Sequence, residues 1–221
     1  YNQGNFIEET ILSVLNQNYL DLEYIVVDGG SADQTHDILN KYTQQLTWFS
    51  EPDEGQTSAI NKGLRMASGE VVAYLNSDDL YLPGTLQKVG AFFAAHPEAD
   101  WLSGYCKNID AQGRKIRQFI RQYKNFWLRT RAYKALLVLN YIAQPATFWR
   151  RSVTDELGYL DESLHYTMDY EYWLRIGKMH KLHLLKQDLA AFRLHGDSKS
   201  GTTASNQFDE ELKVARRYGS P

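Results

Sequence analysis

Residues 24–30 are Tyr24-Ile25-Val26-Val27-Asp28-Gly29-Gly30, a short apolar run that ends in an acid and two glycines. A second run of this kind occupies residues 71–75 and leads into Asn76-Ser77-Asp78-Asp79. Apolar runs of this length, set between helical patterns, are typical of parallel strands that are buried on both faces. They predict an α/β class, with a mostly parallel central sheet flanked by helices.

Helical patterns surround both runs. Apolar residues recur at helical spacing in 6–15 and in 59–67, and Gly69 is placed to end the second of these helices. Ser31 and Gln34 form a capping-box pattern, which predicts the start of a helix that continues through Leu39. A short strand is expected at 47–49.

The second half of the chain has a different pattern. Residues 100–118 are interpreted as a β-hairpin with its turn at 110–113, followed by a helical stretch and a strand at 146–149. A helix from about Met168 and two strands within 182–194 come next. Because no linker rich in Gly, Ser or Pro separates the halves, we expect one domain over 1–221. Its first half (about 1–100) is followed by a smaller mixed lobe (about 101–221).

The composition is that of an ordinary soluble globular protein. There are 24 basic and 27 acidic side chains, and the resulting net charge of −3 gives no reason to expect nucleic acid as a partner. A single cysteine, Cys106, excludes an internal disulfide framework and fits a reducing, cytoplasmic compartment. No apolar run approaches the roughly 20 residues that a membrane-spanning helix needs.

Acidic side chains follow both apolar runs. Because the carboxyl ends of parallel strands share one edge of a sheet, where ligands bind, Asp28 and Asp78 are expected at a common site. Oxygen-rich ends of this kind suit Mg²⁺ or Mn²⁺, which one or two carboxylates hold together with substrate phosphates. The structural alternative is that Asp79 caps a helix beginning near Pro83 and that Asp28 caps the turn at residues 29–30. Each acid taken singly fits either interpretation, whereas the two together favour a site.

Four segments, in their order and spacing, resemble the family 2 glycosyltransferases: Tyr1-Asn2, residues 26–35, residues 53–63 and Leu75-Asn76-Ser77-Asp78-Asp79. The resemblance covers most of the chain and is more specific in the first half. It implies the GT-A fold, in which a nucleotide-binding α/β half is joined to an acceptor-binding half. Members of the family are typically inverting enzymes that use a divalent metal.

The resemblance also implies a set of donor-binding residues. Asp28 is expected to contact the base of the nucleotide, and the same nucleotide-sugar pocket would be lined by Tyr1, Asn2, Gly55, Gln56 and Ser77. Lys62 is expected either to reach the donor or to be an ordinary lysine on a helix surface. A strand that is central in the family's sheet ordinarily precedes the Tyr1-Asn2 position, so the sequence is expected to be a fragment that lacks it.

Two residues are implied as metal ligands. Asp78 falls on the metal-binding acid of the family's Asp-any-Asp motif, and Asn76 stands where many members have the first acid, which leaves Asp78 as the direct ligand. His195 resembles the histidine of the family's closing loop, which completes the metal or diphosphate site. The residues after it include Ser198 and Lys199, which are candidates for binding diphosphate oxygens. The expected cofactor is Mn²⁺ or Mg²⁺.

The candidate general base is Asp169. An inverting transfer needs a base that takes the proton of the acceptor hydroxyl, and Asp169 matches the family's acidic motif before a tryptophan, although Met168 replaces its usual Glu. Thr167 is the expected N-cap, and the helix dipole would favour the ionised form of an acid in the first turn. Helical spacing sets Asp169 beside an apolar, aromatic face, whereas Glu171 is expected to pair with Arg175. The alternative is a helix-terminal charge with no further role.

A basic, aromatic stretch lies in the middle of the chain. Ten Lys or Arg residues and no acid occur from Ala111 to Thr154, interleaved with aromatic side chains. Three interpretations compete: a solvated helix face, a surface that meets anionic lipid head groups or a lipid-diphosphate acceptor, and a site for single-stranded nucleic acid. Nothing else in the sequence supports the third.

The sequence therefore predicts an inverting, metal-dependent glycosyltransferase. It would move a sugar from a UDP-, GDP- or dTDP-sugar to a saccharide or lipid-linked acceptor in cell-surface polysaccharide synthesis, in the cytoplasm or at the inner face of the membrane. One alternative is a sugar nucleotidyltransferase, although its glycine-rich phosphate loop is not visible. Another is a non-enzymatic nucleotide- or glycan-binding module, which the presence of Asp78, Asp169 and His195 together disfavours. A dehydrogenase is disfavoured because Gly29-Gly30-Ser31 does not fit the dinucleotide fingerprint.

Overall fold

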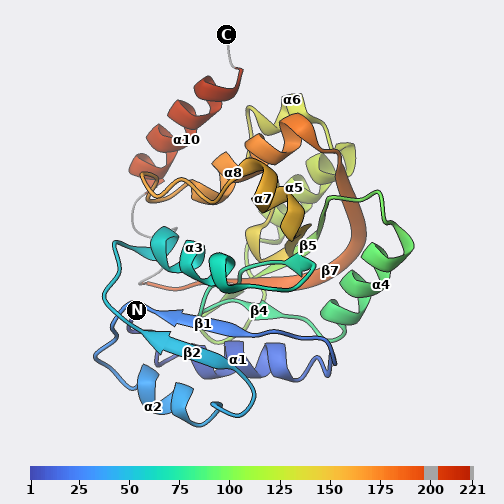
Figure 1. Ribbon diagram of the computed structural model, residues 1–221. Helices are drawn as coiled ribbons and strands as arrows, with labels where there is room; N and C mark the ends of the chain where they lie inside the picture. Colours follow the sequence, from blue (N-terminus) through green and yellow to red (C-terminus); the bar gives the residue numbers. More distant parts are fainter. Residues whose placement is uncertain (197–203, 220–221) are drawn as a thin grey trace.

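Figure 1 shows the computed structural model, in which residues 1–196 and 204–219 are described. Elements of the first half gather at the bottom of this view and helices of the second half at the top, with β5 and β7 between them. The strands are β1 (Ile25–Asp28), β2 (Thr47–Ser50), β3 (Val71–Val72), β4 (Leu80–Tyr81), β5 (Trp101–Asp110), β6 (Thr147–Arg150) and β7 (Leu182–Leu194). The helices are α1 (Ile7–Leu15), α2 (Thr35–Asn40), α3 (Gln56–Met66), α4 (Thr85–Ala95), α5 (Gln118–Thr130), α6 (Tyr133–Leu136), α7 (Arg151–Leu157), α8 (Met168–Met179) and α10 (Ala204–Tyr218), with a 3-10 turn η1 (Gln144–Ala146).

The described strands form two sheets. β1 and β2 make a parallel pair, and the other five strands have the order β3-β6-β5-β7-β4. In this larger sheet β5 and β7 run parallel, whereas β3, β4 and β6 pair antiparallel to their neighbours. The predicted α/β class is confirmed, but the expected mostly parallel arrangement holds only for β1–β2 and β5–β7. The reason is that β6 runs antiparallel to β5. The short strands β3 and β4 lie at opposite edges of the sheet and are also antiparallel to their neighbours.

Two strand predictions need correction in the second half. The turn at 110–113 is present, with Gly113 N donating to Asp110 O (3.0 Å). The returning strand of the predicted hairpin is reduced to one bridge, Ile109 to Lys115, because α5 begins at Gln118. The two strands expected within 182–194 are one long strand, β7, whose register with β5 shifts on both sides of Tyr105.

Three local predictions in the first half also differ. The run 71–75 forms a strand only at Val71–Val72. Ser31 does not cap α2, because its hydroxyl donates to Asp28 Oδ1 (2.5 Å) and the helix begins at Thr35. Helix α3, predicted to end at Gly69, ends at Met66 instead, with Ala67 at its C-terminal boundary. The helices predicted at 6–15 and 59–67 are confirmed, with α3 starting earlier, at Gln56.

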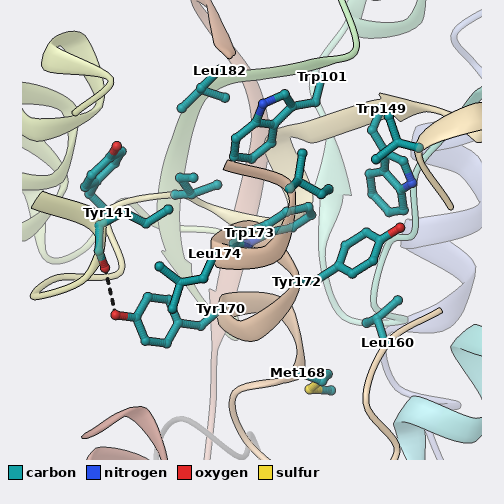
Figure 2. Close-up of a cluster of buried hydrophobic side chains, with 14 of the residues drawn as sticks. Trp101, Tyr141, Trp149, Leu160, Met168, Tyr170, Tyr172, Trp173, Leu174 and Leu182 are labelled. Atoms are coloured by element: carbon teal, nitrogen blue, oxygen red, sulfur yellow. Dashed lines mark hydrogen bonds between the residues drawn. The ribbon is translucent and has the colours of Figure 1, made fainter. Parts of the chain in front are cut away.

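Aromatic side chains dominate the largest core cluster, which joins α8 to β5 and β6 (Figure 2). Trp173 stacks on Trp101 with ring centroids 5.9 Å apart, and its edge meets Trp149 at 5.6 Å. Tyr172, Trp173 and Ile176 are fully buried. Because large buried aromatic rings contribute most to core stability, this face fixes the rotation of α8 about its axis. The N-terminal turn of α8, which carries Asp169, is thereby directed to the cavity described below.

Candidate active site

A cavity of about 1520 Å³ is bordered by both halves of the chain. Part of its wall is apolar and comes from β1 and residues 71–75. The polar part contains most of the predicted site residues: Tyr1, Asp28, Gly55, Gln56, Ser77, Asp78, Asp169 and His195. The cavity therefore brings together candidates that lie up to about 190 residues apart in the sequence.

The Asp28 carboxylate accepts its hydrogen bonds from the loop that follows it and from two neighbouring side chains. Its Oδ2 accepts hydrogen bonds from Ser31 N (2.8 Å), Ser50 Oγ (2.6 Å) and His36 Nε2 (2.8 Å). Burial on its own raises the pKa of Asp28, but the hydrogen bonds from Ser31, Ser50 and His36 together outweigh it, so the pKa lies well below its usual value. The structure thus bears out the turn-capping interpretation, since Gly30 N also donates to Oδ2 (3.1 Å).

The N-terminal segment docks on this same loop. Asn2 N donates to Ser31 Oγ (2.7 Å), and Ala32 N donates to Asn2 Oδ1 (2.9 Å). Asn2 adopts a φ of 51°, a left-handed conformation that Asn tolerates better than most residues. Asn2 thus joins the segment to the loop, while Tyr1 is 69% exposed at the mouth of the cavity.

Residues 53–56 border the cavity next to the Asp28 loop. Gly55 N donates to Asp53 Oδ1 (2.8 Å), and Gly55 has a φ of 121°, which favours glycine. A Cβ at position 29 would lie 2.5 Å from Asp53 Oδ2, so Gly29 is needed for this close approach. Gln56 Nε2 donates to Asn76 Oδ1 (2.7 Å), which links α3 to the segment before Asp78.

The two adjacent acids, Asp78 and Asp79, have different surroundings. Asp79 is fully buried and accepts a hydrogen bond from Arg193 N (2.8 Å). Its burial and the neighbouring Asp78 carboxylate raise its pKa well above the usual value. Because Gly84 precedes α4, Asp79 is not the helix cap that the structural alternative suggested. Asp78 faces the cavity instead, and its backbone carbonyl accepts from Arg193 Nε (2.8 Å).

Asp78 and His195 meet directly, with 3.0 Å between Oδ2 and Nε2. The His195 ring also lies on Phe6, with centroids 4.5 Å apart. In the described part of the chain no three His, Cys, Asp or Glu side chains are grouped to hold a metal. One carboxylate and one imidazole nevertheless fit Mn²⁺ or Mg²⁺, which complete their coordination with water and phosphate oxygens. Ser198 and Lys199 lie outside the described residues.

Lys62 has a different position from the other candidates. Its Nζ lies 2.7 Å from Glu51 Oε1, and Lys62 is not among the described residues that line the cavity. This placement favours the surface interpretation of Lys62. Ser77 lines the cavity, and its carbonyl accepts a hydrogen bond from Thr10 Oγ1 (2.9 Å).

Asp169 is partly buried at the edge of the cavity, where Lys124 of α5 also lies. Burial raises the pKa of Asp169 to about 6, and the hydrogen bond from Tyr170 N (2.7 Å) and the charge of Lys124 lower it only in part. Desolvation is thus the largest influence on the pKa of Asp169 and acts against the ionised form, which the helix dipole was expected to favour. A carboxyl group with this pKa is still mostly ionised at neutral pH.

Glu171 lies in the first turn of α8, and Thr167 directly precedes the helix. The predicted pair is confirmed, because Arg175 Nη2 lies 2.5 Å from Glu171 Oε2. Thr167 precedes the helix as expected, but its side chain does not cap it. The segment before the helix is held by α10: the Glu210 carboxylate accepts from the backbone N–H groups of His165 (3.1 Å), Tyr166 (2.8 Å) and Thr167 (2.8 Å).

The Glu210 contacts predict a positioning role. In a Glu210→Ala variant, three N–H groups before α8 lose their acceptor, and we expect a stability loss of about 1–3 kcal/mol, the usual cost when hydrogen-bond donors are left without a partner. Because Asp169 lies two residues beyond this segment, kcat should fall more than the donor KM changes. Asp209→Ala, an exposed neighbour on α10, is the matched control. Wild-type melting and kinetics for Glu210→Ala would contradict this role.

Sequence reasoning did not identify Glu210, Lys124 or Arg193. Glu210 lies on α10, which packs against α8, and Lys124 lies on α5, from which its charge acts on Asp169; neither relation is marked by a local pattern. Arg193 is 1% exposed and bonds to Asp78 O and Glu9 Oε2 (2.6 Å). The one signal for Arg193 in the sequence was its position two residues before the candidate ligand His195. A buried arginine needs several hydrogen-bond acceptors, and near such a site it finds them in the surrounding loops.

The architecture is that of the GT-A glycosyltransferases. S. aureus TarS in complex with UDP-GlcNAc superposes with a TM-score of 0.74 and 20% identity, covering 99% of this chain and 64% of that one. The mannosyltransferase PcManGT from Pyrobaculum calidifontis, in complex with GDP-Man and Mn²⁺, gives 0.74 and 21%, covering 100% of this chain and 63% of that one. At these identities the likeness shows the fold.

The family is shown by sequence. The pattern of the glycosyl transferase family 2 matches residues 1–158, well over half of the chain, which therefore belongs to this family. A protein of Rickettsia typhi named as an uncharacterized glycosyltransferase is 29% identical over 213 residues, or 95% of this chain and 66% of the relative. A Nostoc sp. protein with the same description is 28% identical and covers 96% and 68%. The chain thus spans about two thirds of these relatives.

Proposed function

We propose that this chain transfers a sugar from a nucleoside-diphosphate sugar to a hydroxyl of a saccharide or lipid-linked acceptor, with inversion at the anomeric carbon. The observation that carries the proposal is that Asp169 and the Asp78–His195 pair border the same cavity. Family membership supports glycosyl transfer, and UDP-GlcNAc and GDP-Man in the two solved neighbours support a nucleotide-sugar donor. A cytoplasmic role in cell-surface polysaccharide synthesis is part of the proposal.

In the proposed reaction Asp169 takes the proton of the acceptor hydroxyl. The acceptor oxygen forms a bond to the anomeric carbon as the bond from that carbon to the diphosphate oxygen breaks, and the nucleoside diphosphate leaves with the electron pair. Asp78 and His195 would hold Mn²⁺ or Mg²⁺, which neutralises negative charge on a leaving diphosphate when bound. Asn2 and the Asp28 loop hold the wall beside which the nucleotide would lie.

The donor test uses the chain with labelled UDP-, GDP- and dTDP-sugars, each with and without Mn²⁺. We expect one of these donors to release its nucleoside diphosphate faster than the others, and faster again with the correct acceptor. The configuration of the product, read from its anomeric proton signal, tests inversion. Cleavage of none of these donors by a folded chain would favour a binding module, and synthesis of a nucleotide sugar from a nucleoside triphosphate would favour a nucleotidyltransferase.

The raised pKa of Asp169 predicts a pH profile. Only the ionised carboxylate accepts a proton, so kcat/KM should be level above about pH 7 and fall by about tenfold per pH unit well below 6. Because the positive charge of Lys124 lowers the pKa of Asp169, Lys124→Gln should move this fall to higher pH. Lys134→Gln, an exposed lysine on α6, is the control. An unmoved profile in Lys124→Gln would contradict the electrostatic contact.

A further inference from the structure

Helix α5 presents its aromatic side chains outward. Phe119, Tyr123 and Phe126 are spaced four and three residues apart, so they share one face of the helix, and they are 81%, 49% and 58% exposed. The opposite face carries Leu128, which is 1% exposed, and Lys124, which lines the cavity. A helix on the surface of a globular protein ordinarily directs its apolar face to the core, and α5 has the reverse arrangement.

Exposed positive charge surrounds this aromatic face at both ends of α5. Lys115 and Arg117 precede the helix, and Arg131 and Lys134 follow it; all four are exposed. In the part of the chain that the structure describes, none of the four forms an ion pair. No acid occurs from Ala111 to Thr154, and the acids that pair with basic side chains around α5, Asp110 and Asp188, bind Arg114 and Arg121 and none of these four.

We propose that the outer face of α5 docks on an anionic lipid bilayer surface. Aromatic rings on one helix face, flanked by Lys and Arg, are the features of helices that lie in the plane of a membrane interface. The unpaired basic residues select a negatively charged partner, which argues against a second copy of this chain, because the same positive surface would face itself. None of the described helices has the length and apolar character to cross a membrane.

The docked orientation has a consequence for the cavity. Because Ile120 and Lys124 of α5 line the cavity while Phe119 and Phe126 face outward, one helix borders both the proposed membrane and the cavity. The cavity would then lie on the side of α5 that faces away from the bilayer, with this one helix between it and the head groups. The membrane docking does not depend on which reaction the chain catalyses, and the docking experiment does not use the reaction.

The test is co-sedimentation with phosphatidylcholine vesicles and with equal mixtures of phosphatidylcholine and phosphatidylglycerol. We expect binding to the anionic vesicles that weakens as salt is added, and little binding to the neutral ones. Phe119→Ser/Phe126→Ser should reduce binding by about tenfold or more, because it removes two inserted rings. Arg117→Gln/Arg131→Gln should reduce both the binding and its salt dependence. The matched control is Leu20→Ser/Met66→Ser, which removes exposed apolar side chains elsewhere.

Circular dichroism and light scattering of each variant accompany the binding measurement. Absence of binding to anionic vesicles at low salt, equal binding to both kinds of vesicle, or equal loss in the control variant would overturn the proposal. Self-association that the Phe119→Ser/Phe126→Ser change abolishes, without vesicle binding, would show that a second copy covers this face. Tight binding of a single-stranded oligonucleotide in place of vesicles would assign the surface to nucleic acid.

Discussion

Replacing Asp169 with Asn is expected to lower kcat by roughly 10²–10⁴, the usual contribution of a general base. The amide keeps the size of the side chain and can still accept from Tyr170 N, but it cannot take up the acceptor proton. Because burial disfavours the ionised carboxyl group, as its pKa of about 6 shows, the neutral amide should not lower the melting temperature. Binding of the nucleoside diphosphate should be nearly unchanged.

The control for this variant is Asp155→Asn, which removes a carboxylate from an exposed pair with Arg151. It should leave both kinetics and melting near those of the wild type. The decisive comparison is kcat with donor affinity, measured on the same preparation. Wild-type turnover by Asp169→Asn would remove Asp169 from the reaction and leave it as a charge at a helix terminus.

Asp78→Asn is expected to have the second large effect, a loss of about a hundredfold or more in kcat/KM. The change removes the only carboxylate in contact with His195 among the described residues, so the Mn²⁺-dependent part of nucleotide binding should disappear. This binding is measured by calorimetry without turnover. Asp37→Asn, an exposed acid on α2, is the control and should retain it. Unchanged Mn²⁺-dependent binding in Asp78→Asn would place the metal elsewhere.

Much of the site was predictable because its residues follow elements with strong local patterns. Asp28 and Asp78 were identified from the apolar runs that precede them, and the structure places both at one cavity. The resemblance to the family added His195, which lies 3.0 Å from Asp78 across 117 residues of sequence. No periodicity or spacing in the chain connects these two positions.

Other features depended on competition between local and tertiary contacts. Ser31 has the sequence of a cap but bonds to the buried Asp28, because an ionised carboxylate is the stronger acceptor. Thr167 likewise donates to Glu210 instead of capping α8. The run 71–75 is apolar enough for a strand, but β6 pairs only with Val71 and Val72. Glu210 and β6 come from distant parts of the chain and leave no local signal, whereas Asp28 lies only three residues before Ser31 and competes with the helix for its hydroxyl group.

The central claim is that the cavity binds a nucleoside diphosphate with the help of a divalent metal. Its most direct test is the melting temperature of the chain with UDP, GDP, dTDP and CDP, each with and without Mn²⁺. We expect the melting temperature to rise with one of these nucleotides, only when Mn²⁺ is present, and not in Asp78→Asn. A folded chain whose melting temperature responds to none of the four, or responds equally without Mn²⁺, would contradict it.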